Sequence, residues 1–392
     1  MSMAGSEKRK VLLVFGTRPE AIKMAPVVMA LRNSERCIPI VCVTGQHREM
    51  LDQVMKIFDI KADYDLDLMA PGQDLFDITS RVLLGVRDVI RDVRPDFMLV
   101  HGDTTTCLAG GMAAFYEKIP LGHVEAGLRT FDMSAPFPEE ANRTLVASLT
   151  SQHFAPTNSA KDNLLHEQID GDSIVVTGNT GIDALLIAKQ RSEEFAPAYW
   201  TETFGEALYS RCIDSERKLV LITAHRRENF GNGFLNLCSA IKTLAKTHTS
   251  WDFVFPVHPN PNVQAPVNDS LSGFENIHLI APLDYMPFIW MLNRCEVCLT
   301  DSGGVQEEAP SLGTPVLVMR DVTERPEAVK SGCVKLVGTN ENKNINELEK
   351  CIETPLSDAP VNPYGDGVAA NRIVRSLENS FGAGEPALVF SQ

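Results

Sequence analysis

Short apolar runs alternate with helical stretches along most of this chain, and this alternation is the feature that most limits its fold. In the first half, β-rich runs occupy residues 11–15, 38–43, 97–100, 121–124, 153–155 and 174–176. Helical stretches between them lie at 21–33, 47–58, 75–93, 106–118, 142–149, 159–166 and 182–190. Strands that alternate with helices in this way form a parallel sheet with helices on both faces.

The same pattern starts again near residue 219, after a weak stretch from about 195 to 215. Runs at 219–223, 253–257, 277–280, 297–300, 316–319 and 334–337, with helices at 235–247 and 286–294, predict a second parallel sheet. With 392 residues, of which 44% are apolar, the chain is long enough for two domains. We therefore predict an α/β fold of two Rossmann-like doubly wound domains, residues 1–190 and 191–366, facing a cleft.

Charge and cysteine content exclude several classes of partner and site. The formal net charge of −15 argues against nucleic acid or an anionic membrane surface as a partner. The first apolar run, residues 11–15, is too short for a signal peptide or a membrane span. Nine scattered cysteines are typical of a reduced cytoplasmic protein, and Cys295 and Cys298 are interpreted as core residues because no second CxxC pair accompanies them.

The segment TDSGGVQEEAPSLGTPVLV, residues 300–318, predicts a strand, a glycine turn, a short helix and a second strand. Gly303 and Gly304 allow a ligand to approach the backbone, and the helix start offers free N–H groups to an anion. Glu307 and Glu308 lie one turn further on, where a carboxylate is placed to accept both hydroxyls of a ribose. An ordinary strand-to-helix turn with acidic residues favoured by the helix dipole explains the same pattern, and this segment alone does not decide between the two.

Charged residues also follow other predicted strands. In GTRPEAIKMAP, residues 16–26, Arg18 and Lys23 lie near a helix start, where they could face a phosphate or simply begin a surface helix. Asp103 follows the run at 97–100, and Glu125 follows the run at 121–124. Further polar strand ends are PFPEEANR with Glu139, TAHRREN with His225 and PVHPNPN with His258. So many polar strand ends are difficult to explain as ordinary loops.

Taken together, these motifs resemble the non-hydrolysing UDP-N-acetylglucosamine 2-epimerases of bacteria. The matching segments are GTRPEAIKMAP, TGQHREMLDQV, HGDTTT, HVEAGLRT, PEEANR, AHRREN, DSGGVQEEAP and TERPEA, in this order. The resemblance implies a fold of the glycosyltransferase-B type, with a C-terminal helix, about 367–392, packed on the first domain. It also implies a cytoplasmic homodimer that converts UDP-N-acetylglucosamine (UDP-GlcNAc) to UDP-N-acetylmannosamine (UDP-ManNAc) for surface polysaccharides, with no metal and no redox cofactor.

The resemblance also implies roles for individual residues. The implied catalytic residues are Asp103, Glu125, Glu139 and His225. The implied substrate-binding residues are Arg18, Lys23, Ser302, Gly303, Gly304, Glu308, Arg325 and the backbone of Phe288, in a second domain that binds UDP. The stretches that match an allosteric UDP-GlcNAc site contain Gln46, His47, Arg227 and His258.

The chemistry of the substrate narrows the mechanism. The C2 proton of an N-acetylhexosamine is not adjacent to a carbonyl, so an enzyme must either oxidise a neighbouring hydroxyl or expel UDP to form a C1=C2 double bond. No GxGxxG motif follows the first strand, which disfavours an NAD-dependent oxidation. Elimination needs a base, an acid and cations on the leaving diphosphate, and the motifs contain all three.

Three alternatives remain open at this stage. A hydrolysing 2-epimerase of the same fold would release UDP and free ManNAc, or a related UDP-HexNAc could be the substrate. A glycosyltransferase would need a separate acceptor groove. A non-catalytic nucleotide-sugar sensor would keep the glycine turn and Glu308 but would not need Asp103, Glu125, Glu139 and His225 together.

Overall fold

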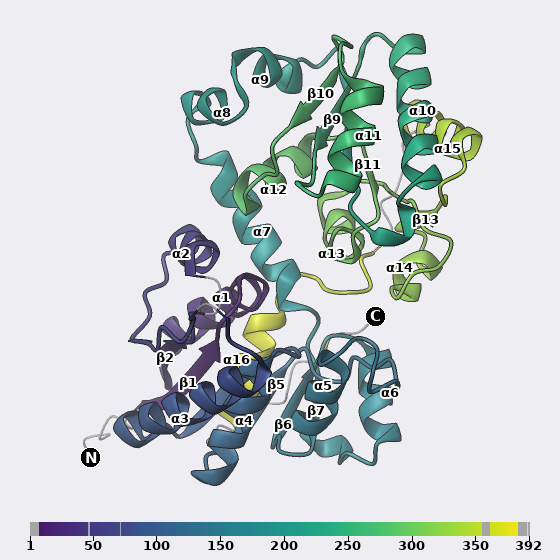
Figure 1. Ribbon diagram of the computed structural model, residues 1–392. Helices are drawn as coiled ribbons and strands as arrows, with labels where there is room; N and C mark the ends of the chain where they lie inside the picture. The colour runs from purple at the N-terminus through teal and green to yellow at the C-terminus, as the bar shows by residue number, and fades with distance from the viewer. Residues whose placement is uncertain (1–7, 46–47, 71, 355–360, 383–389, 391–392) are drawn as a thin grey trace. The chain divides into compact units, whose positions relative to one another are not determined.

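The computed structural model describes residues 8–45, 48–70, 72–354, 361–382 and 390. The chain divides into two compact units (Figure 1). Unit 1 comprises Met1–Ala184 and Tyr364–Gln392, and unit 2 comprises Leu185–Pro363. Each unit is built around its own parallel sheet, so the prediction of two Rossmann-like α/β domains is confirmed.

Unit 1 contains a seven-stranded sheet in the order β3-β2-β1-β4-β5-β6-β7, in which all neighbouring strands are parallel. Its strands are β1 (Arg9–Phe15), β2 (Cys37–Val43), β3 (Tyr64–Asp65), β4 (Phe97–His101), β5 (Leu121–Val124), β6 (Gln152–Ala155) and β7 (Ile174–Val176). Its helices are α1 (Arg18–Arg32), α2 (Arg48–Ile57), α3 (Leu75–Val93), α4 (Thr105–Tyr116), α5 (Glu139–Ala147), α6 (Asn158–His166) and α16 (Ala369–Ser380). Helix α7 (Thr180–Glu193) begins in unit 1 and continues into unit 2.

Local sequence signals explain where the helices of unit 1 begin. Thr17 and Glu20 form a capping box at the start of α1, in which each side chain satisfies a backbone N–H of the first turn. Asp74 and Asp77 form the same arrangement at the start of α3. The strands between the helices are almost continuously apolar, and all five residues of β4 are buried, as expected for a sheet covered on both faces.

The chain returns to unit 1 at its C-terminal end through α16. The buried carboxylate of Asp183 accepts backbone N–H groups from Ala369 at 3.2 Å and Ala370 at 2.8 Å. These two donors belong to the first turn of α16, where a helix leaves its N–H groups without internal partners. Asp183 therefore caps α16, which also contacts α1.

Unit 2 contains a six-stranded parallel sheet in the order β10-β9-β8-β11-β12-β13. Its strands are β8 (Lys218–Thr223), β9 (Trp251–Pro256), β10 (Ile277–Ile280), β11 (Val297–Thr300), β12 (Val316–Val318) and β13 (Val334–Leu336). Its helices are α8 (Pro197–Phe204), α9 (Glu206–Ile213), α10 (Asn232–Thr247), α11 (Pro261–Leu271), α12 (Tyr285–Arg294), α13 (Gly303–Glu308), α14 (Pro326–Lys330) and α15 (Glu341–Glu353). The 3-10 turns Arg227–Asn229 and Ala309–Leu312 complete the unit.

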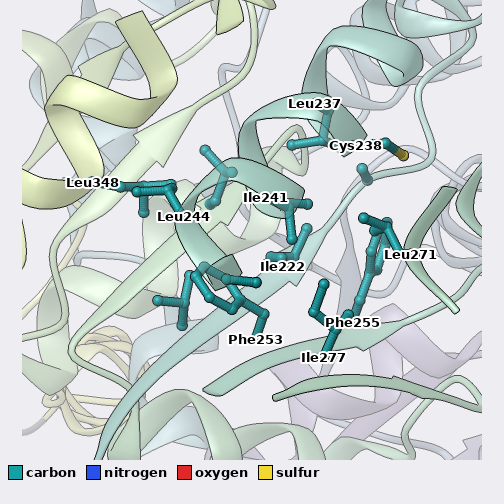
Figure 2. Close-up of a cluster of buried hydrophobic side chains, with 14 of the residues drawn as sticks. Ile222, Leu237, Cys238, Ile241, Leu244, Phe253, Phe255, Leu271, Ile277 and Leu348 are labelled. Atoms are coloured by element: carbon teal, nitrogen blue, oxygen red, sulfur yellow. The ribbon is translucent and has the colours of Figure 1, made fainter. Parts of the chain in front are cut away.

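The core of unit 2 forms where α10, α11 and α15 pack on the central strands. Figure 2 shows Ile241 and Leu244 of α10 beside Phe253 and Phe255 of β9. Both phenylalanines are fully buried, and each buried aromatic ring contributes about 1.5–3 kcal/mol of hydrophobic stabilisation. This core fixes the strands whose ends carry the polar residues described below.

Several elements are not evident from the sequence pattern. Helices α8 and α9 occupy the stretch 195–215, where the periodicity is weak, and they pack through aromatic contacts such as Trp200 with Trp290. Helix α11 contains Pro261 at its start and Pro266 inside it, and these prolines conceal the helical pattern. Cys295 and Cys298 are buried and free, which confirms their interpretation as core residues. Within the described ranges, no helix is long and apolar enough to cross a membrane.

Candidate active site

Glu125 stands at the end of β5 in unit 1 and adopts a left-handed backbone conformation, with φ of 64°. For a residue with a side chain this conformation costs on the order of 1–2 kcal/mol. Its carboxylate forms an ion pair with Lys23 of α1 and lies 3.8 Å from Nε2 of His101 at the end of β4. Residues from three elements thus meet at the carboxylate of Glu125, whose backbone is strained. Strained backbone of this kind is common at functional sites.

His101 is the member of this cluster that sequence analysis missed. Its side chain is buried, and neither ring nitrogen has a hydrogen-bond partner among the described residues. Burial and the nearby charge of Lys23 lower the pKa of His101 to about 3, so the ring is neutral at neutral pH. The residue begins the motif HGDTTT, but it is also the last residue of a buried apolar strand, and the sequence alone does not distinguish it from an ordinary core histidine.

Asp103 follows β4 and is held by Arg143 of α5. Nε and Nη2 of Arg143 donate to Oδ2 of Asp103 at 3.0 and 2.6 Å, and the Asn142 amide donates to the Asp103 carbonyl at 2.8 Å. The Nη1 group of Arg143 donates to Glu140 at 2.8 Å. Because β4 and β5 are neighbours in the sheet, Asp103 and Glu125 lie at adjacent strand ends.

The two glutamates that begin α5 differ in their surroundings. Glu140 is buried and accepts the backbone N–H groups of Thr130 and Phe131 at 3.0 and 2.9 Å. Burial opposes ionisation of Glu140, but these N–H donors together with Arg143 hold its pKa below the ordinary value. Glu139 is half-buried and makes no recorded hydrogen bond within the described part of the chain, so its carboxylate is available to a ligand.

The start of α1 contributes two predicted phosphate ligands with different environments. Arg18 is the first residue of α1, and its guanidinium makes no recorded ion pair with any described residue. Lys23, also predicted to face a phosphate, is instead paired with Glu125. Glu20, which sequence analysis did not single out, is buried. It accepts a hydrogen bond from Oγ1 of Thr104 at 2.6 Å, which connects the start of α1 to the loop that follows β4.

In unit 2, the glycine turn after β11 forms as predicted, with Ser302 preceding the six-residue helix α13. The guanidinium of Arg325 lies against this turn: a Cβ atom added at Gly303 would lie 3.3 Å from its Cζ. Nε of Arg325 donates to Glu307 at 2.7 Å, while Gly304 is exposed. Glu308 ends α13 and is half-buried. An exposed glycine turn beside a guanidinium is suited to an anionic ligand.

His225 follows β8, next to β11 in the sheet, and its side chain is 41% exposed. Its Nδ1 atom lies 3.3 Å from Oδ1 of the fully buried Asp301. Partial burial lowers the pKa of His225, an effect that the charge of Asp301 opposes. Asp301 immediately precedes Ser302 in the DSGG sequence, but sequence analysis assigned it no role of its own.

Of the remaining predicted residues, His258, Arg227 and Phe288 lie in unit 2. His258 is exposed, and its ring stacks on His225 with centroids 5.7 Å apart. Arg227 is exposed at the start of a 3-10 turn. The backbone N–H of Phe288 donates to the Asp284 carbonyl at 3.0 Å at the start of α12. Gln46 and His47 lie outside the described residues.

Comparison with known proteins identifies one family over most of the chain. Residues 29–378 match the family described as UDP-N-acetylglucosamine 2-epimerase. The UDP-N-acetylglucosamine 2-epimerase of Yersinia pestis is 52% identical over 376 residues, which cover 94% of this chain and 98% of that protein.

Solved structures agree with the sequence relatives. A putative UDP-N-acetylglucosamine 2-epimerase from Listeria monocytogenes superimposes with a TM-score of 0.91 at 45% identity, covering 98% of this chain and all of the other. The UDP-GlcNAc 2-epimerase of Neisseria meningitidis, bound to UDP-GlcNAc, has a TM-score of 0.81 at 50% identity, covering 94% of this chain and all of the other. The similarity extends over both units.

Proposed function

The chain belongs to the UDP-N-acetylglucosamine 2-epimerase family, and we propose that it interconverts UDP-GlcNAc and UDP-ManNAc without releasing the free sugar. The observation that carries this proposal is similarity over nearly the whole chain to an enzyme solved with UDP-GlcNAc bound. The curated relatives' names do not distinguish hydrolysing from non-hydrolysing enzymes, so the fate of the sugar belongs to the proposal.

The proposed reaction is an elimination followed by re-addition. A base removes the C2 proton, the C–H electron pair forms the C1=C2 double bond, and UDP departs with the electrons of the C1–O bond. UDP then re-adds at C1 while a proton returns to the other face of C2. The reaction is redox-neutral overall and calls for no redox cofactor.

The two units are proposed to supply different groups for this reaction. Unit 1 provides carboxylates for proton transfer at C2, namely Asp103, Glu125 and Glu139, and Arg18 and Lys23 for the diphosphate. Unit 2 provides His225 and the UDP ligands Ser302, Gly303, Gly304, Glu308, Arg325 and the backbone of Phe288. Lys23 forms an ion pair with Glu125 and is proposed to contact the departing diphosphate as well, since a carboxylate and a diphosphate are both anionic.

One NMR experiment in D2O tests the proposal. UDP-GlcNAc and enzyme should yield UDP-ManNAc with deuterium at C2, because the returned proton comes from solvent. Free ManNAc together with UDP would instead identify a hydrolysing epimerase, and an unchanged spectrum would favour a sensor or a transferase that lacks its acceptor. Complete retention of hydrogen at C2 would contradict proton exchange in the elimination route.

We also propose that the enzyme is a homodimer. Apolar side chains are exposed on three helices of unit 1, α3, α4 and α5. Helix α4 contacts both α3 and α5. The exposed side chains are Leu84, Phe115, Tyr116 and Leu145, each at least half exposed. Exposed apolar side chains on neighbouring helices favour a contact with a second copy of the chain. Light scattering should give twice the chain mass, and Leu84→Glu with Phe115→Glu should give the monomer; a monomeric wild type would contradict this.

Activation by UDP-GlcNAc at a second site is the remaining functional proposal. The exposed positions of Arg227 and His258 are compatible with a second ligand, and the contact of His258 with His225 provides a physical connection to the first. Sigmoidal saturation by UDP-GlcNAc that becomes hyperbolic in Arg227→Ala would support it, and hyperbolic wild-type kinetics would refute it. Cys42, Cys107, Cys295 and Cys298 are buried free thiols, which suits the proposed place of the enzyme in cytoplasmic synthesis of surface polysaccharides.

A further inference from the structure

A single buried carboxylate organises the loop that carries His225. Asp301 follows β11 and is fully buried in unit 2. Its two oxygens accept the backbone N–H of His225 at 3.1 and 2.9 Å, and Oδ2 also accepts the backbone N–H of Arg226 at 2.8 Å. The side-chain amide of Asn229 donates to Oδ2 at 3.1 Å. The backbone before the 3-10 turn is therefore fixed by Asp301.

The same carboxylate also acts on the imidazole ring. Nδ1 of His225 lies 3.3 Å from Oδ1 of Asp301. A negative charge beside Nδ1 favours a proton on that nitrogen, in the neutral Nδ1–H tautomer or in the imidazolium ion. In either case Nε2 is the nitrogen that can gain or lose a proton, and the 41% exposure of the side chain leaves it open to a ligand.

We propose that Asp301 is a positioning residue that holds His225 in the Nδ1–H tautomer and so makes Nε2 its reacting atom. The inference rests on the proposed role of His225 in the epimerisation. A neutral histidine in water favours the Nε2–H tautomer, so Asp301 reverses the ordinary preference. With the proton on Nδ1, the Nε2 lone pair can take a proton, and the resulting imidazolium can return it or face a phosphate.

Two other groups, besides Asp301, act on the pKa of the His225 ring. The His258 ring stacks on His225, and Arg226 precedes the 3-10 turn. Burial has the largest effect and lowers the pKa of His225. The charge of Asp301 raises it, while His258 and Arg226 lower it, and the net result is a pKa below the ordinary value. His225 is therefore largely neutral at neutral pH, and only in a neutral imidazole does the tautomer decide which nitrogen can act as a base.

A measurement on the unmodified enzyme tests the tautomer directly. Long-range 1H–15N correlation spectra of protein labelled with 15N-histidine distinguish protonated from bare ring nitrogens. The His225 signals are assigned by their loss in His225→Asn. Predominance of the Nδ1–H form in the wild type supports the proposal, and predominance of the Nε2–H form overturns it. This test does not depend on whether any variant of Asp301 folds.

Asp301→Asn then tests the cause. This change removes the charge but keeps an acceptor oxygen for the loop. His225 should therefore shift toward the Nε2–H form, and its pKa should fall further because the charge that raises it is lost. The kcat should fall at least about 10-fold, because the orienting carboxylate of a histidine is lost, with a smaller change in KM. Unaltered tautomer and titration of His225 in a folded Asp301→Asn protein would overturn the proposal.

Asp252→Asn is the matched control. Asp252 is an equally buried carboxylate of unit 2, but it contacts His278 at 2.9 Å rather than His225. Asp252→Asn should alter the His278 signals and leave the His225 signals and the kcat unchanged. If the His225 signals change as much in Asp252→Asn as in Asp301→Asn, the specific role of Asp301 is overturned. If His225→Asn retains wild-type epimerisation, the proposed role of His225 fails, whereas the tautomer result on Asp301 stands separately.

Discussion

The two units share one architecture but carry different chemistry at the carboxyl ends of their strands. In unit 1, carboxylates are paired with cations: Glu125 with Lys23, and Asp103 with Arg143. In unit 2, the corresponding edge carries an exposed imidazole, His225, and a glycine turn beside Arg325. Groups of the first kind suit proton transfer, and groups of the second kind suit an anion. The common fold therefore positions functional groups without determining what they do.

A buried aspartate in each unit shows that partners, rather than burial alone, decide ionisation. Burial raises the pKa of Asp183 in unit 1 to about 6, although two backbone N–H groups oppose the rise. Asp252 in unit 2 is also buried, which favours the neutral form. Hydrogen bonds from His278 and Arg217 and the charges of Arg217 and Arg211 outweigh that effect and lower its pKa.

The largest expected effect is in unit 1, at Glu125. Glu125→Gln removes the proposed acid–base group while keeping its size, so kcat should fall on the order of 10²–10⁴-fold, the usual contribution of such a group. UDP affinity should change much less than kcat, because Glu125 is not itself a proposed UDP ligand and the variant leaves the charge of its partner Lys23 in place. Initial rates by NMR and calorimetry with UDP measure the two quantities separately.

Glu117→Gln is the control for this change in unit 1. Glu117 is paired with the exposed Arg91 on the surface, so the variant should keep the wild-type rate. A wild-type rate in Glu125→Gln would show that the Glu125 carboxylate is only structural. If Glu125→Gln lost as much UDP affinity as rate, the proposal that the two units supply different groups for the reaction would be contradicted.

An intermediate effect is expected in unit 2, at Glu308. Glu308→Ala should weaken UDP binding by about 1.5–3 kcal/mol, the range for hydrogen bonds that involve a charged group. Calorimetry with UDP measures this loss, and Glu353→Ala, which removes an exposed carboxylate of α15 in the same unit, serves as the control. If Glu308→Ala and Glu353→Ala bind UDP with equal affinity, the proposed contact between Glu308 and the ribose is wrong.

The smallest expected effect concerns stability and compares the two buried aspartates. Between its ordinary pKa of 3.8 and its folded pKa of about 6, Asp183 binds a proton in the folded protein that the unfolded chain has released. Its contribution to stability is therefore present below pH 3.8 and is lost as the pH rises through 6. Asp183→Asn should lack this loss, which between pH 4.5 and pH 7 is on the order of 2 kcal/mol.

Thermal unfolding at pH 4.5 and pH 7 measures the difference in Tm between each variant and the wild type. Relative to wild type, Asp183→Asn should gain Tm as the pH rises. Asp252→Asn should keep an almost constant Tm difference from wild type over this interval, because the pKa of Asp252 is lowered from 3.8 and its stabilising ionised form is lost only below that pH. The same pH dependence in both variants would contradict the contrast between the units.

Regular periodicity and turn residues were sufficient to predict most of the fold. The strands at Leu121–Val124, Ile174–Val176, Ile277–Ile280 and Val297–Thr300 lie where the sequence predicts them. The two-residue strand β3 and the proline-containing helix α11 were not predicted, because their stability comes from neighbours: β3 pairs with β2, and α11 packs on α10. Tertiary contacts override weak local signals in such elements.

The sequence by itself determined which chemical groups gather at the strand ends, because parallel strands place their carboxyl ends at one edge of a sheet. Only the tertiary structure decided how those groups are paired. Lys23 and Glu125 are far apart in sequence, as are His225 and Asp301, and each pair meets because of strand order and helix packing. Ionisation and tautomer depend on distances of a few ångströms and on burial, which residue spacing along a chain does not fix.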